Sequence, residues 1–345
     1  MSTTNSLVTL DAVRAARTRV APRVHRTPIL SSATAAAFIR ERGGPALRDG
    51  TLFVKAEHLQ KTGSFKARGM TNRIETLAAG QRGRGAITMS AGNAGQAYAW
   101  AGREAGVPMT VVMATSANPT KVEACRGYGA EVVLEGANVG EAFRALERIR
   151  DERGLTFVHP FEDAAVIAGH GSVGLEILED LPEVDVVVVG VGGGGLISGV
   201  AVAIREQRPG VRVYGVEPTQ ADAMTRAIAA GRPVPVDPHT VADGLAAPFA
   251  GDLTLAMCRR YLEDIVLLDD DAILTGVRFG IERMKQALEP AGAAGLAAVL
   301  HGRIPIRDGE RVVVVGSGGN LDVARLGELI AAAAPLPASL EGAAG

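Results

Sequence analysis

The chain has 345 residues, of which 47% are hydrophobic and 21% are charged, so it is long enough for about two domains and a large core. Its 36 basic and 38 acidic residues give a formal net charge of −2, which argues against a nucleic-acid binder because such proteins carry a basic face. The two cysteines, Cys125 and Cys258, exclude a disulfide framework and favour buried thiols. The segment from Met1 to Arg14 lacks the pattern of a secretion signal, so we expect a cytoplasmic protein.

An uncharged stretch from Val186 to Ile204 has the length of a membrane span. However, it begins with the β-branched run Val186–Val189, and five glycines between positions 190 and 195 interrupt it. A buried strand, a glycine turn and a helix explain this pattern better than a bilayer helix does. We therefore expect no membrane contact.

Short β-rich runs alternate with helical patterns along the chain. In chain order, the predicted strands are Leu52–Lys55, Ala86–Met89, Met109–Met113, Glu131–Leu134, Thr156–Val158, Asp185–Val189, Val211–Val216 and Arg311–Val315. The predicted helices are Ser64–Ala79, Gln96–Ala105, Lys121–Tyr128, Val139–Glu152, Ile167–Asp180, Leu196–Gln207, Asp270–Leu288 and Leu321–Ala333. This alternation predicts an α/β fold with mostly parallel sheets and helices on both faces.

Polar, glycine-bearing turns follow several of these strands, and ligands of open α/β sheets bind at the carboxyl ends of the strands. The first such turn leads into a helix at Lys66, one of only five lysines in the chain. A cation in the first turn of a helix opposes the helix dipole, which favours the neutral amine that reacts with an aldehyde. Lys66 is therefore a candidate nucleophile, although an ordinary solvated lysine also fits this position.

The turn from Gly190 to Gly195 matches the spacing Gly-x-Gly-x-x-Gly, and Glu217 lies near the end of the next strand. That pattern is the fingerprint of a dinucleotide site in which an acidic side chain contacts the ribose. More generally, such a turn presents a row of unpaired backbone N–H groups at a helix N-terminus, and these groups bind a phosphate. From the residues alone, an oxidoreductase that uses NAD or NADP and an enzyme with another phosphate-bearing cofactor both remain open.

Two further turns, Ser90–Gly95 and Gly316–Asn320, each follow a predicted strand. Backbone donors of the first turn could bind a carboxylate, and Asn93 within it could contact a ring oxygen. Ser317 in the second turn could donate one hydrogen bond to a ligand. Tight turns or helix N-caps without a ligand are the alternative interpretation of both.

Taken together, these segments resemble the threonine/serine dehydratase (ammonia-lyase) family of fold-type-II pyridoxal-phosphate enzymes, from about Thr27 to Leu326. The motifs that carry the resemblance stand in the family's order and are Ser64–Gly69, Ser90–Asn93, Gly192–Leu196, Glu289–Ala293 and Ser317–Asn320. The resemblance implies an α/β fold like that of the tryptophan synthase β chain, with two open, mostly parallel, twisted sheets flanked by helices. It also implies a large cofactor-binding domain (1–83 and 156–345), a small mobile inserted domain (84–155) and a homodimer or higher homo-oligomer.

The family's roles carry over to the matching positions. Lys66 matches the lysine that binds the aldehyde of pyridoxal 5'-phosphate covalently, and Phe65 matches the residue that flanks the cofactor ring. Asn93 matches the contact to the ring hydroxyl, and Ser317 matches the partner of the pyridine nitrogen. The phosphate cradle corresponds to Gly192, Gly193, Gly194 and Gly195, and the loop for the substrate carboxylate corresponds to Ser90, Ala91, Gly92 and Asn93.

The activity that the resemblance implies is β-elimination from L-threonine, L-serine or a related 3-hydroxy amino acid, which releases a 2-oxo acid and ammonia. Lys66 would remove the α-proton, and the cofactor ring would accept the electron pair. The hydroxyl of Ser317 cannot enforce a protonated ring nitrogen as a carboxylate would, so the cofactor ring is only a moderate electron acceptor. Such a ring suits a reaction in which the β-hydroxyl leaves early. The alternatives are an amino-acid racemase, a nicotinamide oxidoreductase and a non-catalytic amino-acid sensor.

Several positions depart from the family's pattern. Ala94 stands where the family usually has histidine, which leads us to expect room for a bulkier 3-hydroxy amino acid. Ala91 replaces the second catalytic serine of related racemases, and because an alanine cannot deliver a proton we expect little racemisation. His170 replaces a common glutamine. The chain ends soon after Asn320, so we expect no feedback inhibition through the regulatory domain that long biosynthetic relatives carry.

Some relatives bind a divalent cation through a glutamate, a backbone carbonyl and an aspartate. Glu217 and Ala221 match the first two ligands, but Ala223 occupies the position of the aspartate. Asp222 substitutes for it only if the loop shifts, and a hard cation needs several oxygen ligands. Glu217, Ala221 and Asp222 are therefore candidate ligands of an incomplete cation site.

Overall fold

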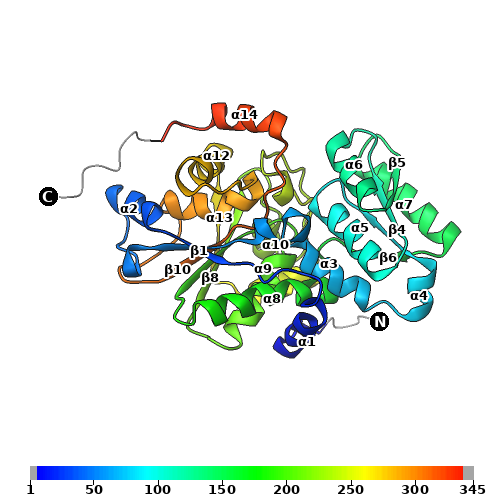
Figure 1. Cartoon of the computed structure of the whole chain (residues 1–345), viewed down its shortest axis with the longest axis horizontal. Coiled ribbons are helices and arrows are strands. Elements are labelled where there is room, and N and C mark those ends of the chain that lie inside the picture. Colours follow the sequence, from blue (N-terminus) through cyan, green and yellow to red (C-terminus); the bar gives the residue numbers. More distant parts are fainter. Residues whose placement is uncertain (1–5, 337–345) are drawn as a thin grey trace.

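The computed structural model describes residues 6–336 and contains two open β-sheets that lie side by side along the long axis of the molecule (Figure 1). The larger sheet has six strands in the order β1-β2-β10-β7-β8-β9, and the smaller has four in the order β5-β4-β3-β6. The β1–β2 pair is antiparallel, and the other described pairs are parallel. The strands are β1 Ile29–Ser32, β2 Leu52–Lys55, β3 Ala86–Met89, β4 Met109–Met113, β5 Glu131–Leu134, β6 Thr156–Phe157, β7 Val186–Gly190, β8 Arg212–Pro218, β9 Asp264–Leu268 and β10 Val312–Val315.

The central strands of the larger sheet, β7 and β10, are continuous β-branched runs because helices bury both of their faces. Successive side chains of a strand point to opposite faces of the sheet. Val187 and Val313 therefore pack into one core, whereas Val186 and Val312 pack into the other.

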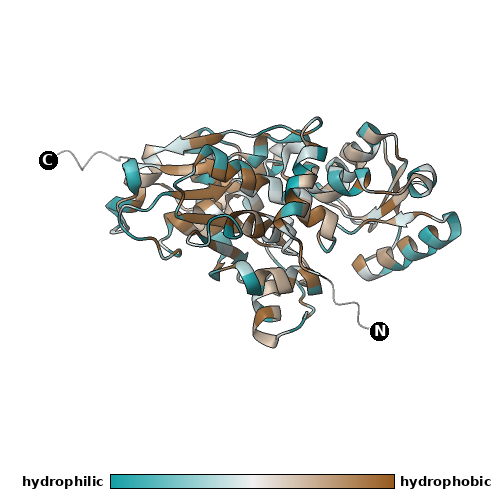
Figure 2. Cartoon of the chain, turned by 90° about the horizontal axis from the view of Figure 1, so that it is seen from below, coloured by the Kyte–Doolittle hydropathy of each residue, from teal (hydrophilic) through white to brown (hydrophobic). Residues whose placement is uncertain are grey.

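Helices α1, α8, α9, α10 and α11 cover one face of the larger sheet, and α2, α12 and α13 cover the other. Figure 2 shows hydrophobic residues concentrated on the inner strands and helices of this part of the molecule. The helices are α1 Leu10–Val20, α2 Ala33–Glu41, α3 Lys66–Glu75, α4 Ala79–Arg84, α5 Asn93–Ala105, α6 Pro119–Gly127, α7 Val139–Arg153, α8 Ala164–Asp180, α9 Gly195–Arg205, α10 Ala223–Ala230, α11 Asp252–Tyr261, α12 Asp270–Phe279, α13 Pro290–Leu300 and α14 Val323–Ala332.

The smaller sheet has its own two cores. Helices α5 and α6 pack on one face of this sheet, and α7 packs on the other. Helix α3 contacts α5 of the smaller part and α8 of the larger part, so it lies between the two sheets (Figure 1). Its first residue, Lys66, is therefore placed at their junction.

The predicted α/β class and the two mostly parallel sheets are confirmed. Strand β6 pairs with β3, so the smaller sheet extends past residue 155, where we placed the end of the small domain. The helix predicted over Asp270–Leu288 instead ends at Phe279 in a π-helical turn, Gly280–Met284. It cannot continue regularly because Lys285 adopts a left-handed conformation with φ of +59°.

The uncharged stretch from Val186 to Ile204 forms β7, a glycine turn and most of α9, as predicted. Both elements are buried inside the larger part of the molecule. Within residues 6–336, each helix is too short or too polar to cross a bilayer.

Candidate active site

Lys66 begins α3, and its amine is largely shielded from water. The Nζ atom donates a hydrogen bond of 3.1 Å to the carbonyl oxygen of Pro160 and lies 5.1 Å from the centre of the Phe65 ring. Burial lowers the pKa of the Lys66 amine to about 8. The helix dipole was the expected cause of a lowered pKa, and burial acts in the same direction. A neutral amine that can react with an aldehyde is thus populated near neutral pH.

Close packing of α3 on α8 holds Lys66 in place. A Cβ atom on Gly169 would lie 2.7 Å from the Cα atom of Gly69, so the two helices approach through glycines. The Nδ1 atom of His170 accepts a hydrogen bond of 3.2 Å from the Gly69 N–H, and its ring packs edge-on against Phe65 at 4.7 Å. His170, for which the sequence suggested no role, therefore supports the first turn of α3.

The predicted phosphate cradle is the turn between β7 and α9. Gly194 has a φ of +84°, which favours glycine, and a Cβ atom on Gly193 would lie 2.3 Å from a ring carbon of Phe161. Within residues 6–336, no group accepts a hydrogen bond from the N–H groups of Gly192 to Gly195. These donors lie at the N-terminus of α9, where the helix dipole also favours an anion.

One segment after β6 connects Lys66 to this glycine turn. Pro160 accepts the hydrogen bond from Lys66, and the ring of the next residue, Phe161, lies against Gly193. Burial and the charge of Lys66 lower the pKa of the neighbouring His159 to about 4, so its ring is neutral. Sequence analysis missed this segment, although its place directly after a predicted strand was an available signal. The structure thus brings the predicted nucleophile and the predicted cradle together.

The loop Gly316–Asn320 follows β10 and lies against the start of α3. The N–H of Phe65 donates a hydrogen bond of 3.1 Å to the carbonyl oxygen of Ser317, and Ser64 forms a β-bridge with the same loop. Ser317 is buried, and its hydroxyl lies 3.4 Å from the carbonyl oxygen of Ala291. The buried hydroxyl of Ser64 has no partner among the described residues. The Ser64 hydroxyl is therefore available to a ligand, whereas the Ser317 hydroxyl would first give up its long hydrogen bond to Ala291.

Asn93 begins α5 and reaches from the smaller sheet to the larger part of the molecule. Its Nδ2 donates a hydrogen bond of 2.6 Å to Oε1 of Glu289, and its Oδ1 accepts one of 2.8 Å from Nδ2 of Asn320. Burial and the charge of Asp243 raise the pKa of Glu289 to about 7. Sequence analysis gave Glu289 no role, although an acidic residue directly before Pro290 at a helix start was a usable signal.

Ser90, Ala91 and Gly92 form the turn between β3 and α5. The N–H of Gly92 donates a hydrogen bond of 3.2 Å to the Ser90 hydroxyl, and Ala91 is exposed. Ala94, in contrast, is buried with Ala67 in the core between α3 and α5. Its small side chain packs between these helices, and the room for a bulkier substrate that we expect from Ala94 remains a prediction.

Glu217 lies in β8, and its side chain is fully buried. Its carboxylate accepts hydrogen bonds from two backbone N–H groups of α10 and from the hydroxyl of Thr225, while Asp222 pairs with Arg226. Burial raises the pKa of Glu217 to about 7. These contacts hold Glu217 against α10 and Asp222 against Arg226. The ribose contact of Glu217 and the cation site with Ala221 and Asp222 remain predictions. Within residues 6–336, no cluster of three His, Cys, Asp or Glu residues could hold a metal ion.

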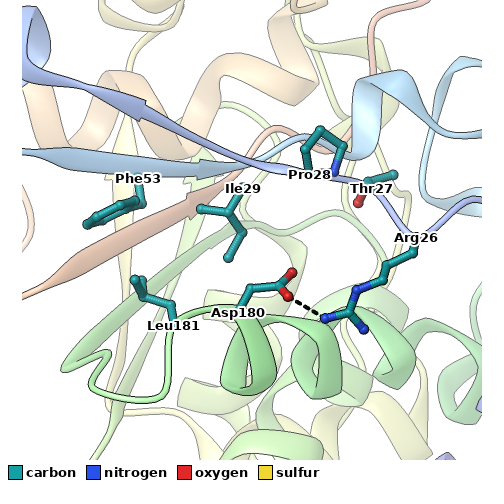
Figure 3. A pocket seen from close by; sticks show the side chains of 7 residues that line it. All are labelled: Arg26, Thr27, Pro28, Ile29, Phe53, Asp180 and Leu181. Carbon is teal, nitrogen blue, oxygen red and sulfur yellow. Dashed lines mark hydrogen bonds and ion pairs between the residues drawn. The ribbon is translucent and has the colours of Figure 1, made fainter.

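A separate pocket lies between strands β1 and β2 and the C-terminal end of α8 (Figure 3). It is lined by Arg26, Thr27, Pro28, Ile29, Phe53, Asp180 and Leu181. Arg26 points across the pocket and pairs with Asp180. The pocket contains none of the predicted site residues, so it lies outside the candidate active site.

Comparison with known proteins supplies the family. A model of the family described as "Pyridoxal-phosphate dependent enzyme" matches residues 20–318. The chain is 42% identical to the L-threonine ammonia-lyase of Thermotoga maritima, over 94% of this chain and 78% of that protein. It is 36% identical to a serine racemase of Oryza sativa subsp. indica, over 92% of this chain and 93% of that protein.

Two solved structures are similar over nearly their whole length. Maize serine racemase has a TM-score of 0.87 at 36% identity, over 94% of this chain and 97% of that one. The T.th. threonine deaminase has a TM-score of 0.83 at 37% identity, over 91% of this chain and 99% of that one. The desolvated lysine, the open glycine turn and these similarities agree, and the chain belongs to the family of pyridoxal-phosphate dependent enzymes.

Proposed function

We propose that this chain is an ammonia-lyase that converts L-threonine, L-serine or a related 3-hydroxy amino acid into a 2-oxo acid and ammonia. Its similarity to the L-threonine ammonia-lyase of Thermotoga maritima and to a threonine deaminase structure supports this substrate class. The observation that carries the proposal is the desolvated amine of Lys66, joined through Pro160 and Phe161 to a glycine turn whose four N–H groups have no hydrogen-bond partner within residues 6–336. A reactive amine and an anion site in one place are what pyridoxal phosphate requires.

The residues present fit the cofactor. The N–H groups of Gly192–Gly195 would hold its phosphate, and Lys66 would bind its aldehyde. Ser317 has a buried hydroxyl with only one long contact, and it would donate to the ring nitrogen. Phe65 would flank the ring, and Asn93 would contact the ring hydroxyl while it remains held by its two present partners.

The chemistry follows from these side chains. When bound, pyridoxal phosphate supplies a conjugated ring that accepts the electron pair left on the substrate Cα. The neutral Nζ of Lys66 acts as the general base that takes the α-proton. The backbone N–H groups of the Ser90–Gly92 turn bind the substrate carboxylate, that of Gly92 in exchange for its present bond to the Ser90 hydroxyl, and orient the α-proton toward Lys66. The Ser317 hydroxyl does not enforce a proton on the ring nitrogen, which suits early departure of the β-hydroxyl.

The proposed function is tested by incubating the purified protein with L-threonine and L-serine. We expect equal amounts of ammonia and of 2-oxobutanoate or pyruvate. A panel of bulkier 3-hydroxy amino acids, compared through kcat/KM, identifies the preferred substrate. The proposal is wrong if no member of the panel releases ammonia while the protein carries bound pyridoxal phosphate.

An amino-acid racemase is the second candidate, because two of the similar proteins are serine racemases. Ala91 stands against it, since a methyl group cannot deliver a proton to the opposite face of the substrate. We expect the wild-type protein to form no D-serine above the blank and the Ala91→Ser variant to form it. Chiral chromatography of the products checks this. Equal D-serine formation by both proteins would show that position 91 is irrelevant.

The pKa of Lys66 predicts how cofactor loading depends on pH. Because only the neutral amine reacts with an aldehyde, and its pKa is about 8, the loading rate should rise about tenfold between pH 7 and pH 9 and then level off. Stopped-flow absorbance of the full chain mixed with pyridoxal phosphate measures this rate. A solvated lysine would instead give a rate that rises about tenfold per pH unit up to pH 10.

Three expectations from the sequence remain predictions. The segment 84–155 is expected to move over the substrate, the chain is expected to form a homodimer or higher homo-oligomer, and the protein is expected in the cytoplasm. Cys125 and Cys258 are both buried free thiols, and burial raises their pKa values to about 11 and 12. Light scattering measures the oligomeric state directly.

A further inference from the structure

Glu289 links the two parts of the molecule through Asn93. The residue is the N-cap of α13, its side chain is buried, and its Oε1 accepts the 2.6 Å hydrogen bond from Nδ2 of Asn93. Asn320 donates to the other end of the same amide, so both amide atoms of Asn93 have partners from the larger part. This arrangement leaves the Asn93 side chain only one orientation.

The Glu289 carboxyl group lies between the loop Gly316–Asn320 and the short helix Asp243–Leu245. A Cβ atom on Gly318 would lie 2.1 Å from Oε1 of Glu289, and one on Gly244 would lie 3.9 Å from it. The backbone N–H of Glu289 also donates a hydrogen bond of 3.1 Å to the carbonyl oxygen of Gly318. Glu289 therefore lies at the Ser317 loop without taking part in the proposed proton transfer.

We propose that Glu289 is a positioning residue that fixes the amide of Asn93 for the cofactor ring and fastens the smaller sheet to the larger one. The claim that Glu289 positions Asn93 for the cofactor rests on the proposed function. The claim that it fastens the two sheets rests only on the contacts above. An ionised carboxylate accepts a stronger hydrogen bond than a protonated one does. The fastening should therefore tighten when Glu289 loses its proton.

Two charged groups on neighbouring elements act on Glu289. Asp243, in the short helix Asp243–Leu245, raises its pKa, and Lys121, on α6, lowers it. Asp243 and Lys121 also pair with each other and so form a second contact between the two parts. Burial is the main cause that raises the pKa of Glu289 to about 7, whereas the hydrogen bond from Asn93 lowers it. Because that hydrogen bond favours the ionised carboxylate, it should strengthen as the pH rises through neutrality.

The single tryptophan of the chain reports on this link. Trp100 is buried on α5, the helix that Asn93 begins. We expect its fluorescence in the full chain to show a transition near pH 7, with and without bound cofactor, and we expect Glu289→Gln to abolish it. Glu217→Gln is the matched control, because burial raises the pKa of Glu217 to about 7 but its carboxylate is hydrogen-bonded to α10 and not to Asn93. A transition that persists in Glu289→Gln, or that disappears only in Glu217→Gln, overturns the proposal.

Replacing Asp243 and replacing Lys121 should shift the midpoint of the Trp100 fluorescence transition in opposite directions. Asp243→Asn removes a repelling charge and should move the midpoint to lower pH, whereas Lys121→Met removes an attracting charge and should move it to higher pH. Shifts in one common direction, or none, would show that another group titrates. Thermal unfolding of each variant confirms that it is folded.

The outcome is separable from that of the proposed function. A Trp100 transition that depends on Glu289 in a protein without lyase activity supports the fastening and refutes the function. Lyase activity together with a transition independent of Glu289 supports the proposed function and refutes the fastening. The cofactor assignment is read from the visible absorption of the bound cofactor, whose pH titration should change in Glu289→Gln and stay unchanged in Glu217→Gln.

Discussion

Replacing Lys66 by alanine is expected to lower kcat/KM for L-threonine by at least about 10³-fold while the protein stays folded. The substitution removes both the amine that binds the cofactor's aldehyde and the base that takes the α-proton. Its cost in stability is small, because the side chain makes a single hydrogen bond, to the carbonyl oxygen of Pro160. Ammonia release and the visible absorption of bound cofactor measure the two losses separately.

Two variants sharpen this prediction. Lys66→Arg keeps a positive charge at the start of α3, but a guanidinium neither bonds to an aldehyde nor loses its proton, so activity should fall as far as in Lys66→Ala. Lys285→Arg makes the same exchange at an exposed lysine and should keep full activity. An active Lys66→Arg variant would show that only charge is needed at this position.

Replacing Arg68 by methionine is expected to destabilise the protein by about 3–5 kcal/mol. The Arg68 side chain is 1% exposed and donates hydrogen bonds of 2.7–2.8 Å to the carboxylates of Glu57 and Glu176. Lys55, also buried, pairs with Glu176 at 2.7 Å. Without the guanidinium, Glu176 keeps Lys55, but Glu57 has no other cationic partner within residues 6–336. A buried carboxylate with an uncompensated charge is unfavourable in a poorly solvated core.

The matched control for Arg68 is Arg148, which also pairs with two carboxylates, those of Glu135 and Glu152. Its side chain is 49% exposed, so solvent screens both pairs and Arg148→Met should leave the free energy of unfolding nearly unchanged. Urea denaturation followed by circular dichroism gives both values. A similar loss in the two variants would mean that the buried pairs contribute no more than exposed ones.

The sequence predicted those parts of the fold whose pattern is local. Strands β3, β4 and β5 begin and end at the predicted residues because each is a short apolar run between clear turn signals. Helix α13 went unrecognised, since its alanine- and glycine-rich sequence is buried on all sides and shows no amphipathic period. Strand β1 was also missed, because four residues after Pro28 at a sheet edge acquire their conformation from pairing with β2.

In the candidate site, too, local patterns indicated some residues, whereas the contacts between distant residues could not be predicted. Lys66, the glycine turn and Ser317 each follow a strand and carry a residue type with distinct chemistry, so their positions alone indicated them. The contacts of Pro160 with Lys66 and of Glu289 with Asn93 join residues 94 and 196 positions apart, and no local pattern predicts such pairs. The hydrogen bonds from α10 to the Glu217 carboxylate are likewise visible only in the fold.

The most direct test of the central claim is to reduce the purified protein, with its cofactor bound, by borohydride and to locate the modified peptide by mass spectrometry. Reduction fixes the bond between an amine and the cofactor's aldehyde, so the account predicts the added mass on Lys66, with Lys61 and Lys285 unmodified. Modification of another lysine, or an active protein in which Lys66 stays unmodified, would contradict it.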